Sequence, residues 1–450
     1  MRFLTKEKFF YKNLARLAIP IAASGLITFL ITLTDSIMIG HLGDSAVSGA
    51  YVGGSVATVL QMLISGVESG ITVTSAQLWG KRNTEAIKKS IACGAIIIFS
   101  IGAAVTLCSV LFSKEIAAVF LSSDNLSTGA EYLREIAPSF PFFCITGALA
   151  SGMRSVESPK INAFASLAAL IVNASLNYVL IFGKLGAPTM GISGAALATV
   201  IARIAEAAII ATYVFFIDKK LRIRLRSFLK TNKSSFFSFI KYTLPLVGGQ
   251  VIWIINTLFA TYVIGKFNED FYMAGFAVAN ALNSISYIAM NGLSGALGII
   301  IGKTVGEGNF KKIKEYSYTA QIIFIGLGII TSLALVLIRT PFVSLYGISG
   351  NARDVAVELI GVLAITIIGT CYQSACLIGL VKSGGDVSFI LKNDAFFILC
   401  AVIPLSLTAL RLGAPLNIIF LALKSDQILK CIPAAIKINR FKWIKDVTLK

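Results

Sequence analysis

The sequence predicts an all-α integral membrane protein with twelve transmembrane helices, arranged in two pseudosymmetric lobes of six helices each. Three observations lead to this prediction: an apolar composition, regularly recurring apolar stretches, and the similarity of the two halves of the chain. Of the 450 residues, 56% are hydrophobic and 14% are charged. The mean hydropathy of +0.82 is far above that of soluble domains. The chain is therefore predicted to lie in a lipid bilayer.

Apolar or weakly polar stretches recur along the whole chain. Each is long enough to cross a hydrocarbon core of roughly 30 Å at about 1.5 Å per helical residue. Helices satisfy their own backbone groups inside lipid, and the stretches are too long for barrel strands, so we expect helices. The expected spans are residues 13–40, 45–79, 88–112, 130–153, 161–183, 191–217, 236–266, 271–303, 313–338, 352–381, 388–410 and 413–437.

The net charge of +18 is distributed unevenly between the loops. Basic residues gather in alternate loops, namely "RFLTKEKFFYK", "GKRNTEAIKK", "DKKLRIRLRSFLKTNK", "GKTVGEGNFKKIK" and "KINRFKWIKDVTLK". The intervening loops "GHLGDS", "GKLGAP", "KFNED" and "RLGAP" hold at most one basic residue each. This is the positive-inside pattern, and it predicts that both termini and the middle loop face the cytoplasm. It also makes a nucleic-acid partner unnecessary to explain the charge.

Several classes of site are excluded by residue usage. His41 is the single histidine, so we expect neither a histidine-based metal site nor a Ser-His triad. The seven cysteines are scattered through apolar stretches without CxxC spacing, which indicates packing residues. No phosphate-cradling loop or activated nucleophile is evident, and a membrane enzyme is therefore the weakest of the functions considered. The apolar stretch after the basic start is too long for a signal-peptide core, so we expect it to remain as the first helix.

The two halves of the sequence align with each other. "LARLAIP" ending at Pro20 corresponds to "FIKYTLP" ending at Pro245, half the chain length later. "AQLWGKRNTEAIKK" corresponds to "GKTVGEGNFKKIKE" at nearly the same offset, with Asn83 matched to Asn309. These matches predict a duplicated six-helix unit, with parallel repeats related by an axis along the membrane normal. The predicted organisation is an amino-terminal lobe over 1–217, a basic cytoplasmic linker over 218–235 and a carboxyl-terminal lobe with its tail over 236–450.

Polar side chains form stripes along three of the expected helices. Residues three and four apart share one helix face. Stripes in apolar helices normally face protein or a water-filled cavity, because lipid cannot satisfy their donors and acceptors. They therefore predict a central polar cavity. The stripes are Ser24, Thr28, Thr32 and Asp35; Gln61, Ser65, Glu68, Thr72 and Ser75; and Asn280, Asn283, Tyr287, Asn291 and Ser294.

The order of several motifs resembles the multidrug and toxic compound extrusion (MATE) transporters. The motifs are "LARLAIP", "DSIMIGHLG", "AQLWGKRN", "MRSVESPK" and "NASLNYVLIFGKLGAPTMGISGAALATVIARIAE" in the first half, with "KSGGD" and "RFKWIK" in the second. The resemblance runs from about residue 13 to 445 and is most specific between Asn173 and Glu206. It implies two six-helix lobes and export of amphipathic, often cationic, organic compounds in exchange for protons or sodium ions. We expect a monomer in the plasma membrane whose partners are small organic substrates and lipid, with no cofactor.

The resemblance also implies a cation-coupling site in the amino-terminal lobe. By motif position its members are Asp35, Asn173, Asn177 and Thr199. Asn173 and Asn177 are one helical turn apart and offer hard oxygen ligands. Many members of the family have Asp where this chain has Asn177, so the paired carboxylates are missing here. We expect a proton as the coupling ion, with sodium as the alternative.

The family's carboxyl-terminal acids have no counterpart at their usual positions. These positions hold Trp253 and, approximately, Cys371. The expected lining of the substrate cavity comes instead from Glu68, Gln61, Gln250, Trp253, Asn280, Asn283, Tyr287 and Asn291. Aromatic rings such as Trp253, Tyr262, Tyr287 and Tyr372 can stack on cationic drugs, although packing is their more frequent use.

Other ionisable groups lie within the expected spans. Arg203 and Glu206 are three residues apart, and we expect them to pair with each other. Glu68 has no adjacent cation in its own helix, so it either recognises substrate, carries a second proton, or is satisfied by another helix. Asp35 and Glu68 have no evident matching cation on the striped faces, which favours cationic cargo over anionic cargo. This disfavours the alternative function, a flippase for lipid-linked saccharides of the same superfamily.

The repeat-related prolines Pro20 and Pro245 lie within expected helices. A proline removes one backbone hydrogen bond and clashes with the preceding turn, so each should bend its helix. We expect both prolines to act as hinges.

Overall fold

The computed structural model describes residues 4–121, 126–224, 233–267 and 270–448. Within these ranges the secondary structure is helical, and the β-type pairing is limited to one isolated bridge between Gly385 and Ile444. Ten described helices are long and apolar enough to span a bilayer, or eleven when one bent pair is included. The all-α membrane fold is thus confirmed, and twelve spans are consistent with it. Residues 225–232 of the predicted basic linker lie outside the described ranges.

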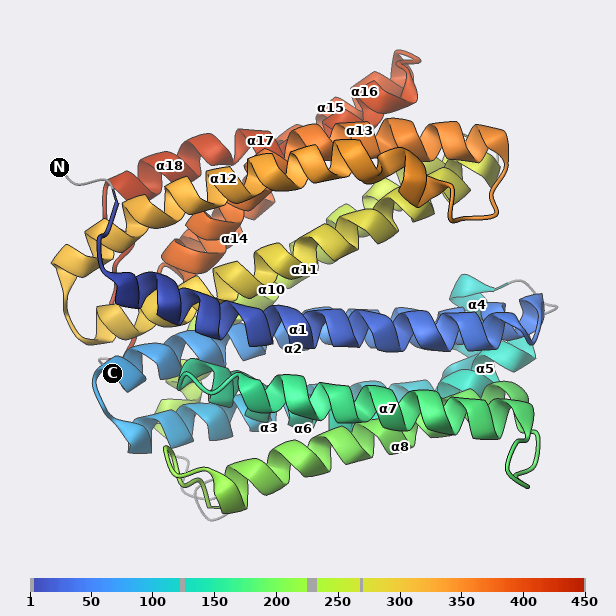
Figure 1. Ribbon diagram of the computed structural model, residues 1–450, viewed down its shortest axis with the longest axis horizontal. Helices are drawn as coiled ribbons and strands as arrows, with labels where there is room; N and C mark the ends of the chain where they lie inside the picture. Colours follow the sequence, from blue (N-terminus) through green and yellow to red (C-terminus); the bar gives the residue numbers. More distant parts are fainter. Residues whose placement is uncertain (1–3, 122–125, 225–232, 268–269, 449–450) are drawn as a thin grey trace. The chain divides into compact units, whose positions relative to one another are not determined.

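The described part of the first half forms nine helical elements (Figure 1). The predicted 130–153 span is divided at Pro138, with a bend of 47°. Proline lacks the amide hydrogen that would continue the helix, but it suits a helix start. The elements are α1 (Lys8–Gly40), α2 (Asp44–Gly80), α3 (Thr84–Leu111), α4 (Ser113–Phe120), α5 (Leu126–Ile136), α6 (Ser139–Ser155), α7 (Lys160–Phe182), α8 (Gly191–Thr212) and the π-helical η2 (Tyr213–Ile217).

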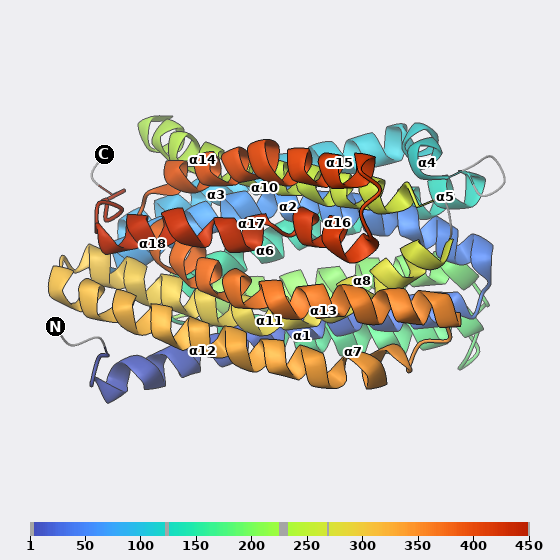
Figure 2. The same cartoon turned by 90° about the horizontal axis from the view of Figure 1, so that it is seen from above.

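The second half contains more interruptions within its spans. The predicted 413–437 span is three short helices instead of one, α16, α17 and α18 (Figure 2). Two other spans continue as π-helix. The elements are α10 (Lys233–Gly265), α11 (Asp270–Gly306), α12 (Phe310–Val343), α13 (Gly350–Gln373), η3 (Ser374–Lys382), α14 (Val387–Phe397), η4 (Ile398–Val402), α15 (Ile403–Arg411), α16 (Leu416–Leu423), α17 (Asp426–Leu429) and α18 (Cys431–Asn439).

The repeated sequence motifs produce the same local structure in both halves. The Asn83 side chain accepts a hydrogen bond from the Ala86 amide and caps the start of α3. Asn309, its match in the repeat, caps the start of α12 through the Lys312 amide. Each asparagine satisfies one amide that the first helical turn leaves without a partner.

The chain separates into two compact units whose boundaries fall inside helices. The amino-terminal unit is Ala23–Val247, and the carboxyl-terminal unit combines Met1–Ala22 with Gly248–Leu449. The boundaries lie just after Pro20 in α1 and Pro245 in α10. The predicted lobes follow the repeat, whereas the contacts group the first part of α1 with the second half of the chain and the first part of α10 with the first half.

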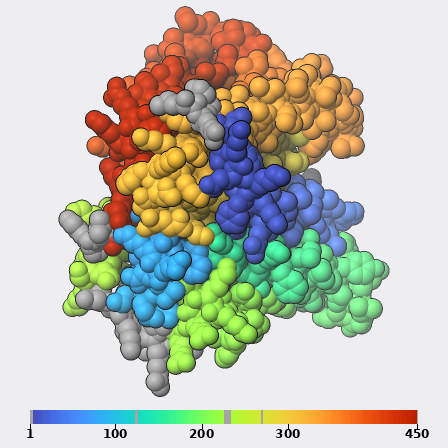
Figure 3. Space-filling view, turned by 60° about the vertical axis from the view of Figure 1, so that its left-hand side comes forward, coloured from blue at the N-terminus to red at the C-terminus, as the bar shows by residue number. Residues whose placement is uncertain are grey.

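Direct contacts anchor the start of α1 within the carboxyl-terminal unit. The Thr5 amide donates to Thr319 Oγ1 at 2.9 Å, and the Tyr316 hydroxyl donates to Glu7 at 2.7 Å. The Phe10 ring stacks on Tyr316 with 4.4 Å between ring centroids. Figure 3 shows this blue segment lying against the orange surface of the second half. The partner residues belong to α12, which lies in the other half of the sequence.

Lysines near the carboxyl terminus form ion pairs with the loop between η3 and α14. Asp386 pairs with Lys437 at 2.6 Å and with Lys445 at 2.8 Å. Burial alone would raise the pKa of Asp386, but the hydrogen bonds from the two lysines outweigh it and hold the pKa below its usual value. Trp443 is fully buried against Gly384, where a β-carbon would lie 2.1 Å from the indole.

Candidate functional site

A cavity of about 560 Å³ lies within the amino-terminal unit, among α1, α2, α5, α6 and α8. Its wall combines polar and aromatic side chains, as is usual for small-molecule sites. The polar residues are Thr28, Thr32, Asp35, Ser36, Ser55, Thr58, Gln61, Ser139, Thr199 and Arg203. The aromatic residues are Tyr51, Tyr132, Phe140 and Phe143.

A chain of hydrogen bonds connects the four residues of the predicted coupling site. Asn177 Nδ2 donates to Asp35 Oδ1, and it also lies 3.4 Å from Asn173 Oδ1. Asn173 Nδ2 in turn donates to Thr199 Oγ1 at 3.4 Å. The structure thus brings together α1, α7 and α8 through these side chains. Asp35 and Thr199 also line the cavity, so the hydrogen-bonded chain begins and ends at its wall.

Close packing of α7 and α8 positions the two asparagines beside Thr199. A β-carbon on Gly194 would lie 2.8 Å from the carbonyl group of Leu180, so glycine allows the two helix backbones to approach. The helices run side by side (Figure 1). Asn173 and Asn177 point from adjacent turns of α7 and are fully buried.

One acceptor in this chain of hydrogen bonds has no partner. Asn177 Oδ1 is buried without a hydrogen bond in the described structure. A buried acceptor without a partner costs free energy, and such groups in native proteins usually face a water, an ion or a function. Asn177 therefore offers a free oxygen next to the carboxylate of Asp35.

Arg203 brings a positive charge to the cavity wall, contrary to the expectation that the carboxylates have no matching cation. Its guanidinium pairs with Glu206 at 2.7 Å, which confirms the predicted pair, and it lies 5.0 Å from the centre of the Phe143 ring. Ser166 donates a further hydrogen bond to Glu206 at 2.9 Å. Because Glu206 balances Arg203, Asp35 supplies the unbalanced charge among the described lining residues.

Glu68 does not line the described cavity. Its carboxylate lies 3.3 Å from Arg154 of α6, and a β-carbon on Gly147 would lie 2.1 Å from Glu68 Oε1. Of the three interpretations that the sequence left open, the structure favours satisfaction by another helix. The partner is 86 residues away in the sequence, and therefore no local spacing could identify it.

The remaining substrate-cavity candidates divide between the two units. Gln61 lines the cavity of the amino-terminal unit, as predicted. Gln250, Trp253, Asn280, Asn283, Tyr287 and Asn291 belong to the carboxyl-terminal unit and do not line that cavity. Trp253 lies beside Lys430, with 5.1 Å between Nζ and the ring centroid. A role in substrate binding stays a prediction for these six residues.

A stripe on α2 was missed by the sequence analysis. Tyr51, Ser55, Thr58 and Gln61 follow one another at helical spacing and all line the cavity. The stripe predicted from Gln61 onward toward the helix end includes residues that do not line the cavity. The signal was present in the sequence before Gln61, because the stripe starts at Tyr51, about three helical turns earlier.

A family model described as MatE matches the chain twice, over residues 20–179 and 245–408. The chain belongs to this family. The two matches start at the repeat-related residues Pro20 and Pro245, which confirms the internal duplication inferred from the motifs.

Individual relatives agree with membership of the MatE family. A probable multidrug resistance protein NorM from Thermotoga maritima is 24% identical over 360 residues, covering 80% of this chain and 76% of its own length. The crystal structure of the eukaryotic MATE transporter AtDTX14 superimposes with a TM-score of 0.87 at 16% identity and 97% coverage of both chains. A MATE structure in complex with MaL6 superimposes with a TM-score of 0.86 at 18% identity, covering 96% of this chain and 97% of that one. The structural likeness establishes the MATE fold.

Proposed function

We propose that this MatE protein is a secondary active exporter that exchanges amphipathic, often cationic, organic compounds for protons. The observation that carries the proposal is Asp35, which both lines the cavity and heads the hydrogen-bonded chain through Asn177 and Asn173 to Thr199. A transporter is also the function class of the family, and relatives named as probable multidrug resistance proteins support the type of cargo. The chemistry of the site requires no enzymatic step.

The cavity suits an organic cation of modest size. Its volume of about 560 Å³ lies within the range of small-molecule sites, which is roughly 300 to 1,000 Å³. Tyr51, Tyr132 and Phe140 supply aromatic surface, and an aromatic face attracts a cation. Asp35 adds a negative charge that a cationic substrate and a coupling ion would both neutralise. Competition for this one charge is how ion entry would be linked to substrate exit.

The membrane potential supplies part of the driving force. One charge that moves inward across roughly 100 mV releases about 2.3 kcal/mol, which supports a gradient of about fiftyfold for a neutral substrate. A monovalent cationic substrate exchanged one for one cancels this electrical contribution. Its export then depends on the pH gradient, the sodium gradient or a second coupling ion.

We favour a proton over sodium as the coupling ion, because the site holds a single carboxylate. No group of three or more His, Cys, Asp or Glu side chains suited to a metal ion occurs within the described part of the chain. The free Asn177 Oδ1 would accept a hydrogen bond from protonated Asp35. Sodium remains the alternative, since Asp35, Asn173, Asn177 and Thr199 are all oxygen donors.

A flippase for lipid-linked saccharides is the less favoured function. The relatives are named for multidrug resistance, and Glu206 balances the cavity's arginine, leaving no free cation for a phosphate among the described lining residues. We further propose that the protein is a monomer in the plasma membrane, with both termini in the cytoplasm. The spacing of basic loops supports this orientation.

Transport by purified protein in proteoliposomes tests the proposal. Ethidium transport is measured with a pH gradient and a sodium gradient imposed separately, using wild type, Asp35→Asn and Asp354→Asn. The last variant removes an exposed carboxylate on α13 and is the matched control. We expect Asp35→Asn to bind ethidium but not to accumulate it against a gradient, because the amide keeps the size and loses the titration. Wild-type accumulation by Asp35→Asn would falsify the coupling role.

A further inference from the structure

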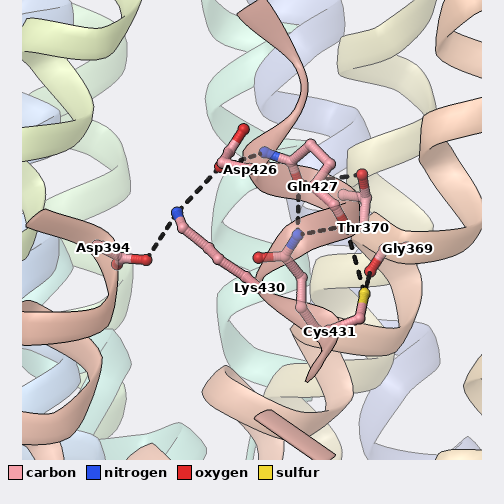
Figure 4. A network of polar contacts seen from close by, with 8 residues as sticks. Gly369, Thr370, Asp394, Asp426, Gln427, Lys430 and Cys431 are labelled. Atoms are coloured by element: carbon pink, nitrogen blue, oxygen red, sulfur yellow. Dashed lines mark hydrogen bonds and ion pairs between the residues drawn. The ribbon is translucent and has the colours of Figure 1, made fainter. Parts of the chain in front are cut away.

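A buried triad of charged side chains lies within the carboxyl-terminal unit and shares no residue with the site described above. Lys430 Nζ is 2.9 Å from Asp394 Oδ1 and 2.9 Å from Asp426 Oδ2 (Figure 4). Lys430 and Asp426 are fully buried, and Asp394 is 5% exposed. Gln427 donates to the same Asp426 oxygen at 2.9 Å. Carboxylates from α14 and α17 thus meet at the ammonium group of the residue that follows α17.

The charges within the triad do not balance. Two carboxylates surround one ammonium group, which leaves one negative charge, and a buried charge without a partner is costly. Asp426 Oδ1 is buried with no hydrogen-bond partner in the described structure. In Figure 4 this oxygen points away from Lys430, while its twin accepts both hydrogen bonds. The triad therefore lacks one positive charge for balance.

Other ionisable side chains interact with the triad without completing it. Lys424 interacts electrostatically with Asp426, but its ammonium lies over the Phe420 ring at 5.5 Å from the centroid, not against a carboxylate. Tyr287 of α11 and Cys431 of α18 also interact with Asp426, and Cys371 of α13 interacts with Tyr287. The tyrosine and the two cysteines are neutral groups and supply no cation.

Three of the helical spans that contribute to this region, those of α13, α14 and α17, are irregular near it. α13 changes to π-helix directly after Gln373, which donates to Gln427 Oε1 at 2.9 Å. α14 changes to π-helix one turn after Asp394. The last span is interrupted on both sides of α17, which begins at Asp426 and ends just before Lys430. π-Helical bulges are frequent at functional sites, and interrupted helices form many of the ion sites of transporters.

The internal repeat relates this triad to the cavity of the amino-terminal unit. "KLGAP" starting at Lys184 matches "RLGAP" starting at Arg411. The third residues of these motifs, Gly186 and Gly413, both have positive φ, 81° and 64°, which glycine adopts without strain.

The register of these matched motifs extends into the helices that follow them. Without any gap, it places Thr199 on Asp426 and Arg203 on Lys430. Thr199 and Arg203 line the cavity, and Thr199 ends the hydrogen-bonded chain that starts at Asp35. Asp426 therefore corresponds to one member of the proposed coupling site and Lys430 to an arginine of the cavity wall, whereas Asp394 falls on Leu167 and has no counterpart there.

We propose that the Asp394–Lys430–Asp426 triad is a second ion-coupling site, in which Lys430 is a permanently tethered cation and one exchangeable proton completes the charge balance. The proton is taken from water on one side of the membrane by a carboxylate oxygen and is returned to water on the other side, with no other bond changed. Because the Lys430 ammonium occupies the place between the carboxylates, sodium is excluded. This inference rests on the proposed function as a proton-coupled exporter.

Removing the tethered cation provides the first test. Lys430→Met leaves two carboxylates facing an empty position, so we expect the variant to bind sodium where wild type does not. The readout is the melting temperature of purified protein in NaCl against choline chloride, since a ligand that binds the folded state raises stability. Lys424→Met is the matched control and should show no sodium response. A folded Lys430→Met variant without a sodium response overturns the tethered-cation role.

The number of protons per substrate provides the second test. Reversal potentials in proteoliposomes give this ratio for wild type, Asp394→Asn and Asp426→Asn. We expect Asp426→Asn to transport with one proton fewer per substrate, while an unchanged ratio in both variants overturns the proposal. If the Lys430→Met variant fails to fold, the number of protons per substrate alone decides whether the triad is a coupling site. Failure of the proposed function can be told apart from failure of the triad proposal. In the first case the Asp35→Asn variant would export substrate normally, whatever the Lys430, Asp394 and Asp426 variants show.

Discussion

Val247 packs its backbone directly onto Gly66, so that a β-carbon on Gly66 would lie 2.7 Å from Val247 Cα. This contact joins α2 to the first part of α10 inside the amino-terminal unit. The equivalent contact in the carboxyl-terminal unit joins Gly292 to Ala22, where a β-carbon would lie 3.0 Å from Ala22 Cα. Both contacts lie just after a repeat-related proline. In each unit, a glycine therefore packs against the proline-containing helix: Gly66 against α10 in the amino-terminal unit, and Gly292 against α1 in the carboxyl-terminal unit.

Gly66→Ala should destabilise the protein by about 1 to 3 kcal/mol, because backbone atoms must move to admit the methyl group. The gain in helix propensity of about 1 kcal/mol offsets only part of this cost. Thermal unfolding in detergent measures the effect. Gly54→Ala in the same helix is the control, since a β-carbon there would meet nothing within 4 Å. A Gly66→Ala variant as stable as the Gly54→Ala variant would contradict the packing argument.

Pro20→Ala should slow transport more than it changes stability. The proline lies inside α1 just before the boundary between the two units, where a change of bend would act on both. A barrier higher by about 1.4 kcal/mol slows transport tenfold. Transport rates and melting temperatures are compared with those of Pro341→Ala, a proline inside α12 that is far from either boundary in the sequence. Wild-type transport by Pro20→Ala would mean that the proline is a static kink.

Glu68→Gln should lower the free energy of unfolding by about 3 kcal/mol, because it leaves the Arg154 guanidinium without its partner in a largely buried position. The double variant Glu68→Gln with Arg154→Met should recover most of the loss. Glu358→Gln, which removes an exposed carboxylate on α13, is the control and should change little. Chemical unfolding measures all three. A stable Glu68→Gln protein that has lost proton coupling would instead make Glu68 a proton carrier.

Asp386→Asn should lower stability near neutral pH by about 2 kcal/mol, since it removes the charged acceptor of Lys437 and Lys445. The pKa of Asp386 is lowered in the folded protein, so its contribution is present above the unfolded value of 3.8. It is lost as the pH falls through the folded value. The difference in melting temperature between wild type and variant should therefore be constant above about pH 5 and shrink below about pH 4. A difference that persists unchanged into strong acid would rule out this linkage.

The cytoplasmic orientation predicts opposite labelling at two exposed positions. On a background without the seven native cysteines, Leu185→Cys should react with an impermeant thiol reagent in intact cells. Lys219→Cys should react only after permeabilisation, because it lies in the basic middle loop. External labelling at residue 219 would reverse the predicted topology.

The elements that sequence predicted best are those set by local spacing. Long apolar stretches predicted the helices, and Asn173 and Asn177 follow from a one-turn spacing on α7. The interruption of the last span was not predicted, because its residues are largely as apolar as those of a regular helix apart from Lys424, Asp426, Lys430 and, at its end, Lys437. The first three charges, which lie inside the span, were the available signal.

Partners distant in sequence were not predictable from one chain. Arg154 meets Glu68 across 86 residues, and Asp394 meets Lys430 from a different helix. The sequence places Trp253 and, approximately, Cys371 at the positions where the family has its carboxyl-terminal acids, so no acid was expected there. The structure shows that two other carboxylates are buried nearby, and that Trp253 lies beside the lysine between them.

The assignment of Met1–Ala22 to the carboxyl-terminal unit has a consequence for synthesis. Thr5 leaves the ribosome early, but its hydrogen-bond partner Thr319 follows much later, from the other half of the sequence. The start of α1 therefore cannot form these native contacts until α12 has been translated. Contacts this distant in sequence are slow to form. If the protein were expressed as two separate halves, divided between the repeats, the carboxyl-terminal half would lack residues 1–22, which pack in its unit. The amino-terminal half would carry these residues without their packing partners.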